Sequence, residues 1–217
     1  TFGRSTDTDD LTGTTLQTTT RIPEKEAIEE AIQSHFTGAI SQLPPQYSAL
    51  KIDGQRAYAL ARQGEKVELK TRPVTIFDYQ ILDYAPTALK VSVTVSSGTY
   101  IRSLARDLGT VLSSLAHVSA LCRTAIGSFS LTDAHELKTF TPQEIIPLDE
   151  AINFLPSHTL KKDCLSLVQN GHPLKDSFFT EPETLKNLVG YSLLREPSGK
   201  LLSILENQTY IIPHYQP

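Results

Sequence analysis

The 217-residue sequence contains no methionine and no tryptophan, and its only cysteines are Cys122 and Cys164. These two lie far apart and have no partners at metal-ligand spacing, which argues against a disulfide framework or a metal cluster and favours two idle or buried thiols. No apolar run approaches the roughly 18 to 20 residues that cross a bilayer, and no basic segment with an apolar core stands at the front. We therefore expect a cytoplasmic protein with no membrane partner.

Charge is scarce overall but unevenly distributed. The chain is 39% hydrophobic and 20% charged with a net charge of -4, a composition typical of a globular protein with one substantial core and a small second domain. Residues 46–72 nevertheless carry six cations against three acidic residues, and residues 98–123 carry three arginines against Asp107. Two basic segments in an acidic protein fit a phosphate-contacting face, and solvated surface charge is the alternative.

Apolar periodicity and turn residues predict an α+β fold with a mixed, largely antiparallel sheet and packed helices. Alternation is clearest over residues 88–95, where apolar side chains occupy every second position. The expected elements are strands over 14–21, 72–82 and 88–95, and helices from Pro23 to Gly38, over 56–64 and from Ile101 to Gly109.

Arg102 stands out at the start of the last of these helices. With Ser97 or Thr99 as N-cap, it falls in the first turn, where the positive end of the helix dipole disfavours a cation. The residue therefore needs an anionic neighbour. That neighbour is either a structural carboxylate or a catalytic carboxylate or phosphate that the planar guanidinium orients.

Tyr47 follows Pro44 and Pro45, which limit its freedom, and basic residues such as Lys51 and Arg62 come after it. A rigid aromatic ring beside cations suits stacking on an unpaired base. A buried core tyrosine explains the same pattern, and periodicity does not decide between the two.

The sequence resembles the bacterial tRNA pseudouridine synthase B (TruB) family in several segments, which occur in the family's order and approximate spacing. The opening FGRSTDTDDLTG is similar to a Gly, Thr-Asp-Thr, Asp and Gly pattern of the family, and ARQGEKVELKTRPVTIFDY also fits. The three strongest segments are PPQYSALKIDGQRAYALARQG (44–64), SGTYIRSLARDLG (97–109) and LCRTAIGSF (121–129).

This resemblance implies isomerisation of the T-loop uridine of tRNA (uridine 55) to pseudouridine, with the base flipped out of the T-loop and without metal or organic cofactor. By motif position, Tyr47 would stack on the flipped base and help remove the C5 proton. Arg102 would pair with the catalytic aspartate, and Leu121 would line the base pocket. Cys122 stands where an arginine is common in the family. Contacts with the T-loop and T-stem are expected at Thr6, Asp7, Lys51, Arg62 and Arg123.

The nucleophile is absent from these motifs. In the family it lies in a Gly-Thr-Leu-Asp-Pro segment upstream of the Thr-Asp-Thr pattern, and no such segment occurs in the 217 residues. Asp7, Asp9 and Asp10 belong to the later motif, and Asp149 in PLDEA follows all the others. With the missing methionine and the abrupt opening, this predicts an enzyme without its N-terminal portion, inactive as the 217 residues alone. The alternative is a non-catalytic tRNA-binding or RNA-folding protein that kept the fold.

The predicted organisation is an incomplete pseudouridine synthase catalytic domain over residues 1–147 and a small RNA-binding, PUA-like domain over 148–217. Residues 187–213 read as a hairpin of two apolar strands joined around Pro197, Ser198 and Gly199. We expect Tyr47, Arg102 and Leu121, which come from distant segments, to converge on one cleft.

Overall fold

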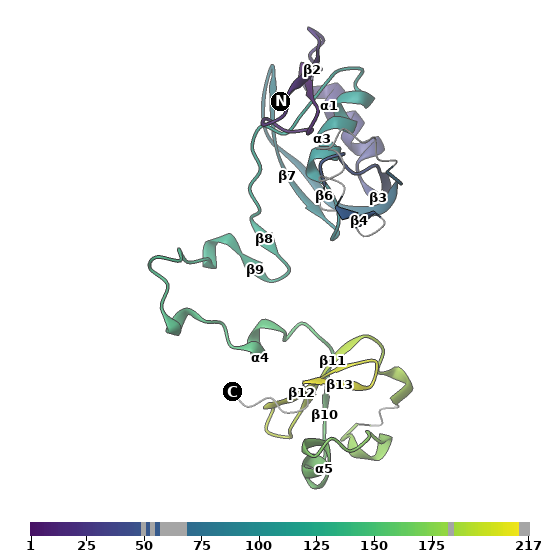
Figure 1. Cartoon of the computed structure of the whole chain (residues 1–217), viewed down its shortest axis with the longest axis vertical. Coiled ribbons are helices and arrows are strands. Elements are labelled where there is room, and N and C mark those ends of the chain that lie inside the picture. Colours follow the sequence, from purple (N-terminus) through teal and green to yellow (C-terminus); the bar gives the residue numbers. More distant parts are fainter. Residues whose placement is uncertain (49–50, 53–54, 57–68, 182–184, 213–217) are drawn as a thin grey trace. The chain divides into compact units, whose positions relative to one another are not determined.

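The computed structural model describes residues 1–48, 51–52, 55–56, 69–181 and 185–212. The predicted helix over 56–64 lies outside them except for Arg56. The chain forms two compact units, Thr1–Leu131 and Thr132–Pro217 (Figure 1). The predicted boundary after residue 147 falls inside the second unit, although the apolar side chains that pack on its hairpin begin with Leu148.

The first unit is organised around an antiparallel sheet in the order β3-β6-β7 (Figure 1). Residues on one face of β6 pack with helices α1 and α3 in a common apolar core that includes Ile28, Ile76 and Leu104. The strands predicted over 72–82 and 88–95 are confirmed, the first extended to residue 85 and the second with the expected bounds. The main elements are α1 (Lys25–His35), β3 (Gly38–Gln42), β6 (Arg72–Ala85), β7 (Ala88–Val95) and α3 (Ile101–Val111).

Helix α1 forms as its apolar spacing predicts. Ile28, Ala31 and Ile32 are buried on one face, while the acidic residues of the helix face solvent. The helix ends at His35, and Gly38 then adopts a φ of 70°, a conformation that few other residues tolerate, to begin β3.

Helix α3 differs from the prediction at both ends. Its N-cap is Tyr100, without a side-chain cap, because the Thr99 hydroxyl donates to the Ser96 carbonyl and does not reach the helix. At the other end the helix continues through Gly109 to Val111. Gly109 is buried against the backbone of Ala116, so its lack of a side chain serves close packing rather than helix termination.

Short strand pairs complete the first unit. The β1-β2 hairpin is antiparallel and carries the Thr-Asp-Thr segment at its turn. Two isolated bridges, Phe2 with Ala116 and Asp10 with Val118, join the start of the chain to the segment after α3. The remaining strands are β1 (Arg4–Thr6), β2 (Thr15–Thr18), β4 (Lys51–Ile52), β5 (Gln55–Arg56), β8 (Ala125–Ile126) and β9 (Phe129–Ser130).

The second unit contains a sheet in the order β10-β11-β12-β13, and the predicted hairpin is confirmed as the antiparallel pair β11 and β12. Its core includes fully buried Leu160, Leu194 and Leu205. The strands are β10 (Ser157–Thr159), β11 (Tyr191–Arg195), β12 (Leu201–Glu206) and β13 (Thr209–Ile212). The described part of this unit contains the helices α4 (Leu148–Ala151) and α5 (Leu165–Gln169), and single 3₁₀ turns at Pro142–Glu144, Lys162–Cys164, Asp176–Phe178 and Leu185–Asn187. A further 3₁₀ turn, Leu131–Asp133, begins at the last residue of the first unit.

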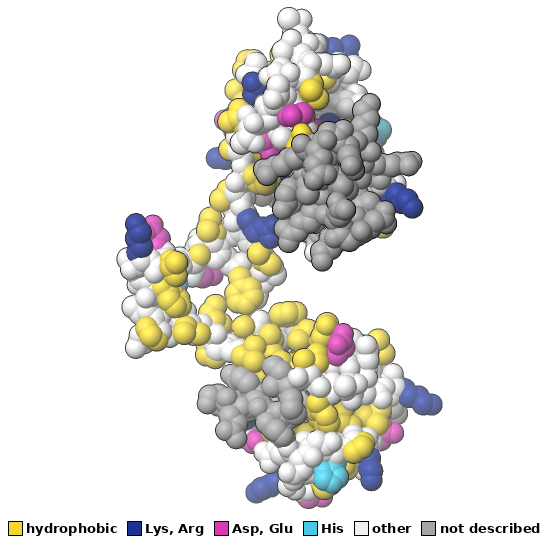
Figure 2. All heavy atoms as spheres, in the orientation of Figure 1, with side chains coloured by type: hydrophobic (Ala, Val, Ile, Leu, Met, Phe, Trp, Pro, Cys, Tyr) yellow, Lys and Arg dark blue, Asp and Glu magenta, His cyan; other side chains and the backbone are white. Residues whose placement is uncertain are grey.

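In the described part of the chain, every helix is too short or too polar to span a bilayer. Both cysteines are free thiols; Cys122 is exposed and Cys164 is buried. Figure 2 shows hydrophobic side chains at the surface as yellow spheres. Within residues 121–146, the exposed large apolar side chains are Leu121, Ile126, Phe129, Leu131, Leu137, Phe140, Ile145 and Ile146.

Candidate active site

Arg102, the second residue of α3, joins two segments that are distant in sequence. Its Nη1 donates to the Thr8 carbonyl at 3.0 Å and to the Asp10 carboxylate at 3.2 Å. Its Nη2 donates to the Tyr47 carbonyl at 2.8 Å. The cation in the first turn of the helix thus has the anionic neighbour that its position required, and that neighbour is Asp10.

The Arg102 guanidinium keeps hydrogen-bonding capacity. Arginine carries five N–H donors, and the bonds to Thr8, Asp10 and Tyr47 use three of them. One N–H on Nε and one on Nη2 have no acceptor among the described residues. These two N–H groups are the donors that Arg102 can offer to a further acceptor.

Asp10 is held in its ionised form by the loop around it. Its Oδ1 accepts bonds from the Thr8 hydroxyl at 2.7 Å and from the Thr12 hydroxyl and backbone N–H at 2.6 and 3.0 Å. Partial burial acts to raise the pKa of Asp10, but the bonds from Thr12 and Thr8 and the charge of Arg102 outweigh it and lower the pKa. With both oxygens occupied, Asp10 acts as a structural carboxylate in this structure.

A second arginine, Arg106, lies one turn further along the same face of α3. Its Nη1 donates to Asp9 at 2.9 Å, its Nε to Asp107 at 2.9 Å, and its Nη2 to the Leu43 carbonyl at 2.7 Å. Desolvation by burial raises the pKa of Asp9, and the Arg106 charge opposes that rise. Arg106 therefore contacts the same two segments as Arg102.

The segment from Gln42 to Tyr47 is bound by hydrogen bonds to the start of α3. The buried Gln42 side chain accepts from the Tyr100 N–H at 2.8 Å and donates to the Tyr100 carbonyl at 3.1 Å. The Ser103 hydroxyl donates to the Leu43 carbonyl at 2.8 Å. Pro44 and Pro45 are buried and Tyr47 is half-buried, so the segment that leads to Tyr47 is stiff and well anchored.

Leu121 is three residues from Val118, which pairs with the Asp10 loop, but the Leu121 side chain is not packed into the arginine site. Val118, three residues earlier, pairs with Asp10, and an extended chain places Leu121 within about 11 Å of Val118. The Leu121 side chain is 65% exposed. Arg123 and Cys122 are exposed beside it. The structure therefore brings Tyr47 and Arg102 together, and Leu121 stands outside their contact.

The segment after α3 that leads to Leu121 is anchored at its start by His117. This buried residue was not among those that the sequence predicted to be important. Its Nδ1 lies 3.1 Å from the Arg4 carbonyl and its Nε2 lies 3.1 Å from the Arg4 guanidinium, so Nδ1–H donates and Nε2 accepts. Burial lowers the pKa of His117, which favours the neutral ring that this arrangement requires.

The predicted RNA contacts have different surroundings. Thr6 is 2% exposed and its hydroxyl donates to the Asp10 carbonyl at 2.7 Å, while one Asp7 oxygen accepts from the Thr14 N–H at 2.7 Å. Both side chains thus hold the β1-β2 loop. The Lys51 backbone lies in β4, but its side chain and the whole of Arg62 lie outside the described residues.

Asp149, in the second unit, is bound by an arginine. Its carboxylate lies 2.6 Å from the Arg195 guanidinium, which also donates to the Gly199 carbonyl. This pair joins α4 to the β11-β12 hairpin. Within the described ranges, no three His, Cys, Asp or Glu side chains are arranged to hold a metal ion.

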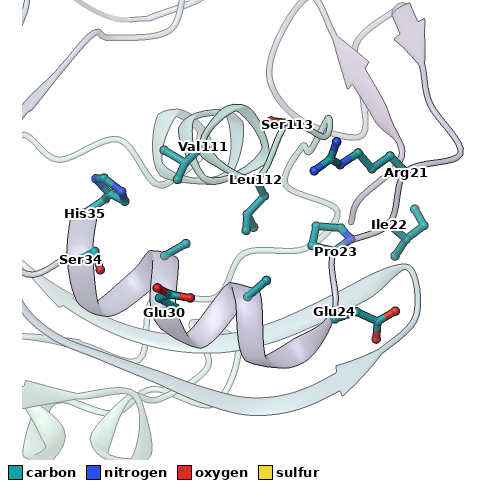
Figure 3. A pocket seen from close by; sticks show the side chains of 12 residues that line it. Arg21, Ile22, Pro23, Glu24, Glu30, Ser34, His35, Val111, Leu112 and Ser113 are labelled. Carbon is teal, nitrogen blue, oxygen red and sulfur yellow. The ribbon is translucent and has the colours of Figure 1, made fainter.

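A groove of about 500 Å³ lies elsewhere in the first unit, between α1 and the end of α3 (Figure 3). Glu30, Ser34 and His35 line one side, and Val111 and Leu112 line the other. The groove includes none of the residues that bind Arg102 or Arg106, so it is separate from the arginine site.

Comparison with known proteins supports the resemblance to the TruB family that the sequence motifs indicated. A family model described as the N-terminal domain of TruB family pseudouridylate synthases matches residues 1–101. A tRNA pseudouridine synthase B of Borrelia garinii subsp. bavariensis is 36% identical over 94% of this chain and 70% of its own length. The corresponding protein of Thermobifida fusca is 38% identical over 96% of this chain and 71% of its own.

A solved structure, the crystal structure of a Cbf5-Nop10-Gar1 complex, contains a chain with the same fold. The TM-score is 0.64 at 22% identity, over 86% of this chain and 56% of that one. The α+β prediction is thereby confirmed. The present chain spans about 70% of the two bacterial relatives and little more than half of the solved chain.

Proposed function

Because the chain belongs to the TruB family of pseudouridylate synthases, we propose that it takes part in isomerising the T-loop uridine of tRNA, uridine 55, to pseudouridine. The relatives that carry this family assignment are named tRNA pseudouridine synthase B. The substrate that we propose for this chain is accordingly a tRNA in the cytoplasm, bound through its T-loop and T-stem.

The observation that supports the proposal most directly is the position of Arg102. It binds the Asp10 loop and the Tyr47 carbonyl and keeps two N–H groups for another acceptor. In the reaction these groups orient the carboxylate of the catalytic aspartate at the ribose C1′. Orientation of a nucleophile by a guanidinium fixes the attack direction, which accounts for a large part of catalytic rate in general.

Tyr47 and Leu121 serve the base. Uridine is flipped out of the T-loop, and the half-buried Tyr47 ring stacks on it and assists removal of the C5 proton. Leu121 is exposed and lies within chain reach of the Asp10 loop, so bound RNA would cover it as one wall of the base pocket. The exposed Arg123 contacts a phosphate.

The nucleophile has no candidate among the carboxylates that the structure describes near Tyr47. Asp9 and Asp10 are bound by Arg106 and Arg102, and Asp149 is bound by Arg195. None of them is a free carboxylate beside Tyr47. We therefore expect the 217 residues alone to bind tRNA weakly and to leave uridine unchanged.

Release of tritium from tRNA labelled at uridine C5 tests the function. We compare the 217 residues with a chimaera in which an upstream segment of a TruB family member that carries the Gly-Thr-Leu-Asp-Pro pattern is fused before Thr1. We expect release only from the chimaera, and Arg102→Ala should abolish it, since loss of nucleophile orientation costs orders of magnitude in rate.

The alternative, a tRNA-binding protein without catalysis, gives the opposite result. In that case the folded chimaera binds tRNA and releases no tritium. Full release by the 217 residues would instead mean that one of the bound carboxylates reaches the ribose. Lys25→Met, on the exposed surface of α1, is the control variant, because its ion pair with Glu29 is remote from the proposed site.

A further inference from the structure

Arg106 belongs to the basic segment of residues 98–123, which fits a phosphate-contacting face. Its contacts in the structure indicate another role. Its three nitrogens each donate to an acceptor in the protein: Asp9, Asp107 and the Leu43 carbonyl. Only 27% of the side chain is exposed. Two carboxylates, Asp9 and Asp107, lie 2.9 Å from the guanidinium and offset its charge, so a phosphate that approached the two remaining N–H groups would meet two like charges.

The contacts of Arg106 run parallel to those of Arg102. Arg102 joins the Thr8–Asp10 loop to Tyr47, and Arg106 joins the adjacent Asp9 to Leu43, at the other end of the same short segment. Residues four apart lie on one helix face, so the two guanidinium groups form two clamps between the same loop and the same segment. A single contact would leave the segment free to rotate about that contact, whereas contacts at both ends fix the orientation of the segment relative to the loop.

We propose that Arg106 is a positioning residue that sets the orientation of the Tyr47 segment against the Asp9–Asp10 loop, and that it does not contact RNA. The inference rests on the proposed function, because orientation of Tyr47 matters when the ring stacks on a flipped base. Arg106 is suited to this task because its planar fork holds a carboxylate and a carbonyl in fixed directions, which a lysine ammonium does not.

Hydrogen exchange in the 217-residue chain tests the clamp without any activity. Arg106→Gln should speed exchange of the amides of residues 46–48 about 5-fold, the effect of losing roughly one net hydrogen bond, and leave β7 unchanged. Lys25→Met should leave both regions unchanged. Equal exchange at residues 46–48 in Arg106→Gln and in the unsubstituted chain would overturn the clamp.

Kinetics and salt dependence in the chimaera test the role in catalysis. Arg106→Gln should lower kcat about 10- to 100-fold with KM within about 2-fold, and Arg106→Lys should recover only part of kcat. The slope of log affinity for tRNA against log salt should not change. In Arg123→Gln, by contrast, the slope should fall by about 0.7 to 0.9, the effect of one lost phosphate contact.

Each result has a definite reading. If Arg106→Gln reduces the salt slope as Arg123→Gln does, Arg106 contacts phosphate and the proposal is wrong. If Arg106→Lys restores kcat fully, charge alone is needed and the fork has no role. If the unsubstituted chimaera forms no pseudouridine, the proposed function fails, and the exchange rates at residues 46–48 still decide whether Arg106 clamps the segment.

Discussion

Apolar side chains form the core of the second unit, whereas the candidate site of the first unit is assembled by polar bonds between distant segments. Leu194 and Leu205 come from neighbouring strands of one hairpin and are fully buried. Apart from the bond between Arg106 and its neighbour Asp107, Arg102 and Arg106 bind partners between 55 and 97 residues away. Burial of apolar surface is non-directional and tolerates small shifts, while a guanidinium bond does not. The first unit is therefore the one in which small displacements affect the site.

The largest effect is expected from a cavity in the second unit. Leu205→Ala should reduce the free energy of unfolding of this unit by about 2–5 kcal/mol, because a fully buried leucine loses its packing and leaves a cavity. Hydrogen exchange measured by mass spectrometry reports the two units separately. Leu137→Ala, at a side chain that is 92% exposed, should change neither unit. Faster exchange across β6 and β7 in Leu205→Ala would show that the units are not stabilised separately.

The contrast between the units also explains which features the sequence could predict. Alternating apolar residues predicted β7 with its observed bounds and the β11-β12 hairpin, because burial on one face leaves a period of two in the sequence. The position of Arg102 predicted an anionic neighbour. That the neighbour is Asp10 depends on a loop 92 residues away, and no local pattern records such a contact.

Gln42 is a second residue whose contacts no local sequence pattern could predict. It is buried in a strand and its amide pairs with both polar groups of the Tyr100 backbone, but a single glutamine has no signature in a sequence. The predicted N-caps, Ser97 and Thr99, were wrong for this reason. The Gln42 side chain from β3 accepts from the N–H of the N-cap residue Tyr100, as a Glu or Gln at the third helical position does in a capping box.

A buried polar substitution provides the second test of the comparison. Gln42→Leu should destabilise the first unit by about 1–3 kcal/mol, because the Tyr100 N–H loses its acceptor and the Tyr100 carbonyl keeps only the bond from the Leu104 N–H. Gln33→Leu, at an exposed position of α1, is the matched control. Thermal unfolding followed by circular dichroism measures both. Equal stability of the two variants would mean that the Gln42 bonds are replaced without cost.

Gly109→Ala should have a smaller effect, because two contributions oppose each other. Alanine in a helix interior is favoured over glycine by about 0.5–1 kcal/mol. A Cβ at Gly109 would however lie 2.7 Å from the Ala116 backbone nitrogen, so the segment after α3 must move, at a cost of about 1–3 kcal/mol. We expect net destabilisation in urea unfolding, with Thr110→Ala at the exposed neighbouring position as control. Stabilisation by Gly109→Ala would show that this segment moves freely.

The smallest effect concerns two adjacent carboxylates whose pKa values shift in opposite directions. Hydrogen bonds and Arg102 outweigh partial burial and lower the pKa of Asp10, so its contribution to stability is present at neutral pH and is lost as the pH falls through its folded pKa. Burial raises the pKa of Asp9 despite Arg106, with Asp107 adding to the rise and Arg102 opposing it. Protonation of Asp9 is therefore easier in the folded state than in the unfolded one.

The two pKa shifts give opposite pH dependences when each aspartate is replaced by the uncharged isostere. The stability difference between the unsubstituted chain and Asp10→Asn should shrink as the pH is lowered from 7 toward 3, whereas the difference from Asp9→Asn should shift in favour of the unsubstituted chain. Urea unfolding at a series of pH values measures both differences. Parallel curves for the two variants would show that the Asp9 and Asp10 carboxylates share one environment, contrary to the separate clamps of Arg106 and Arg102.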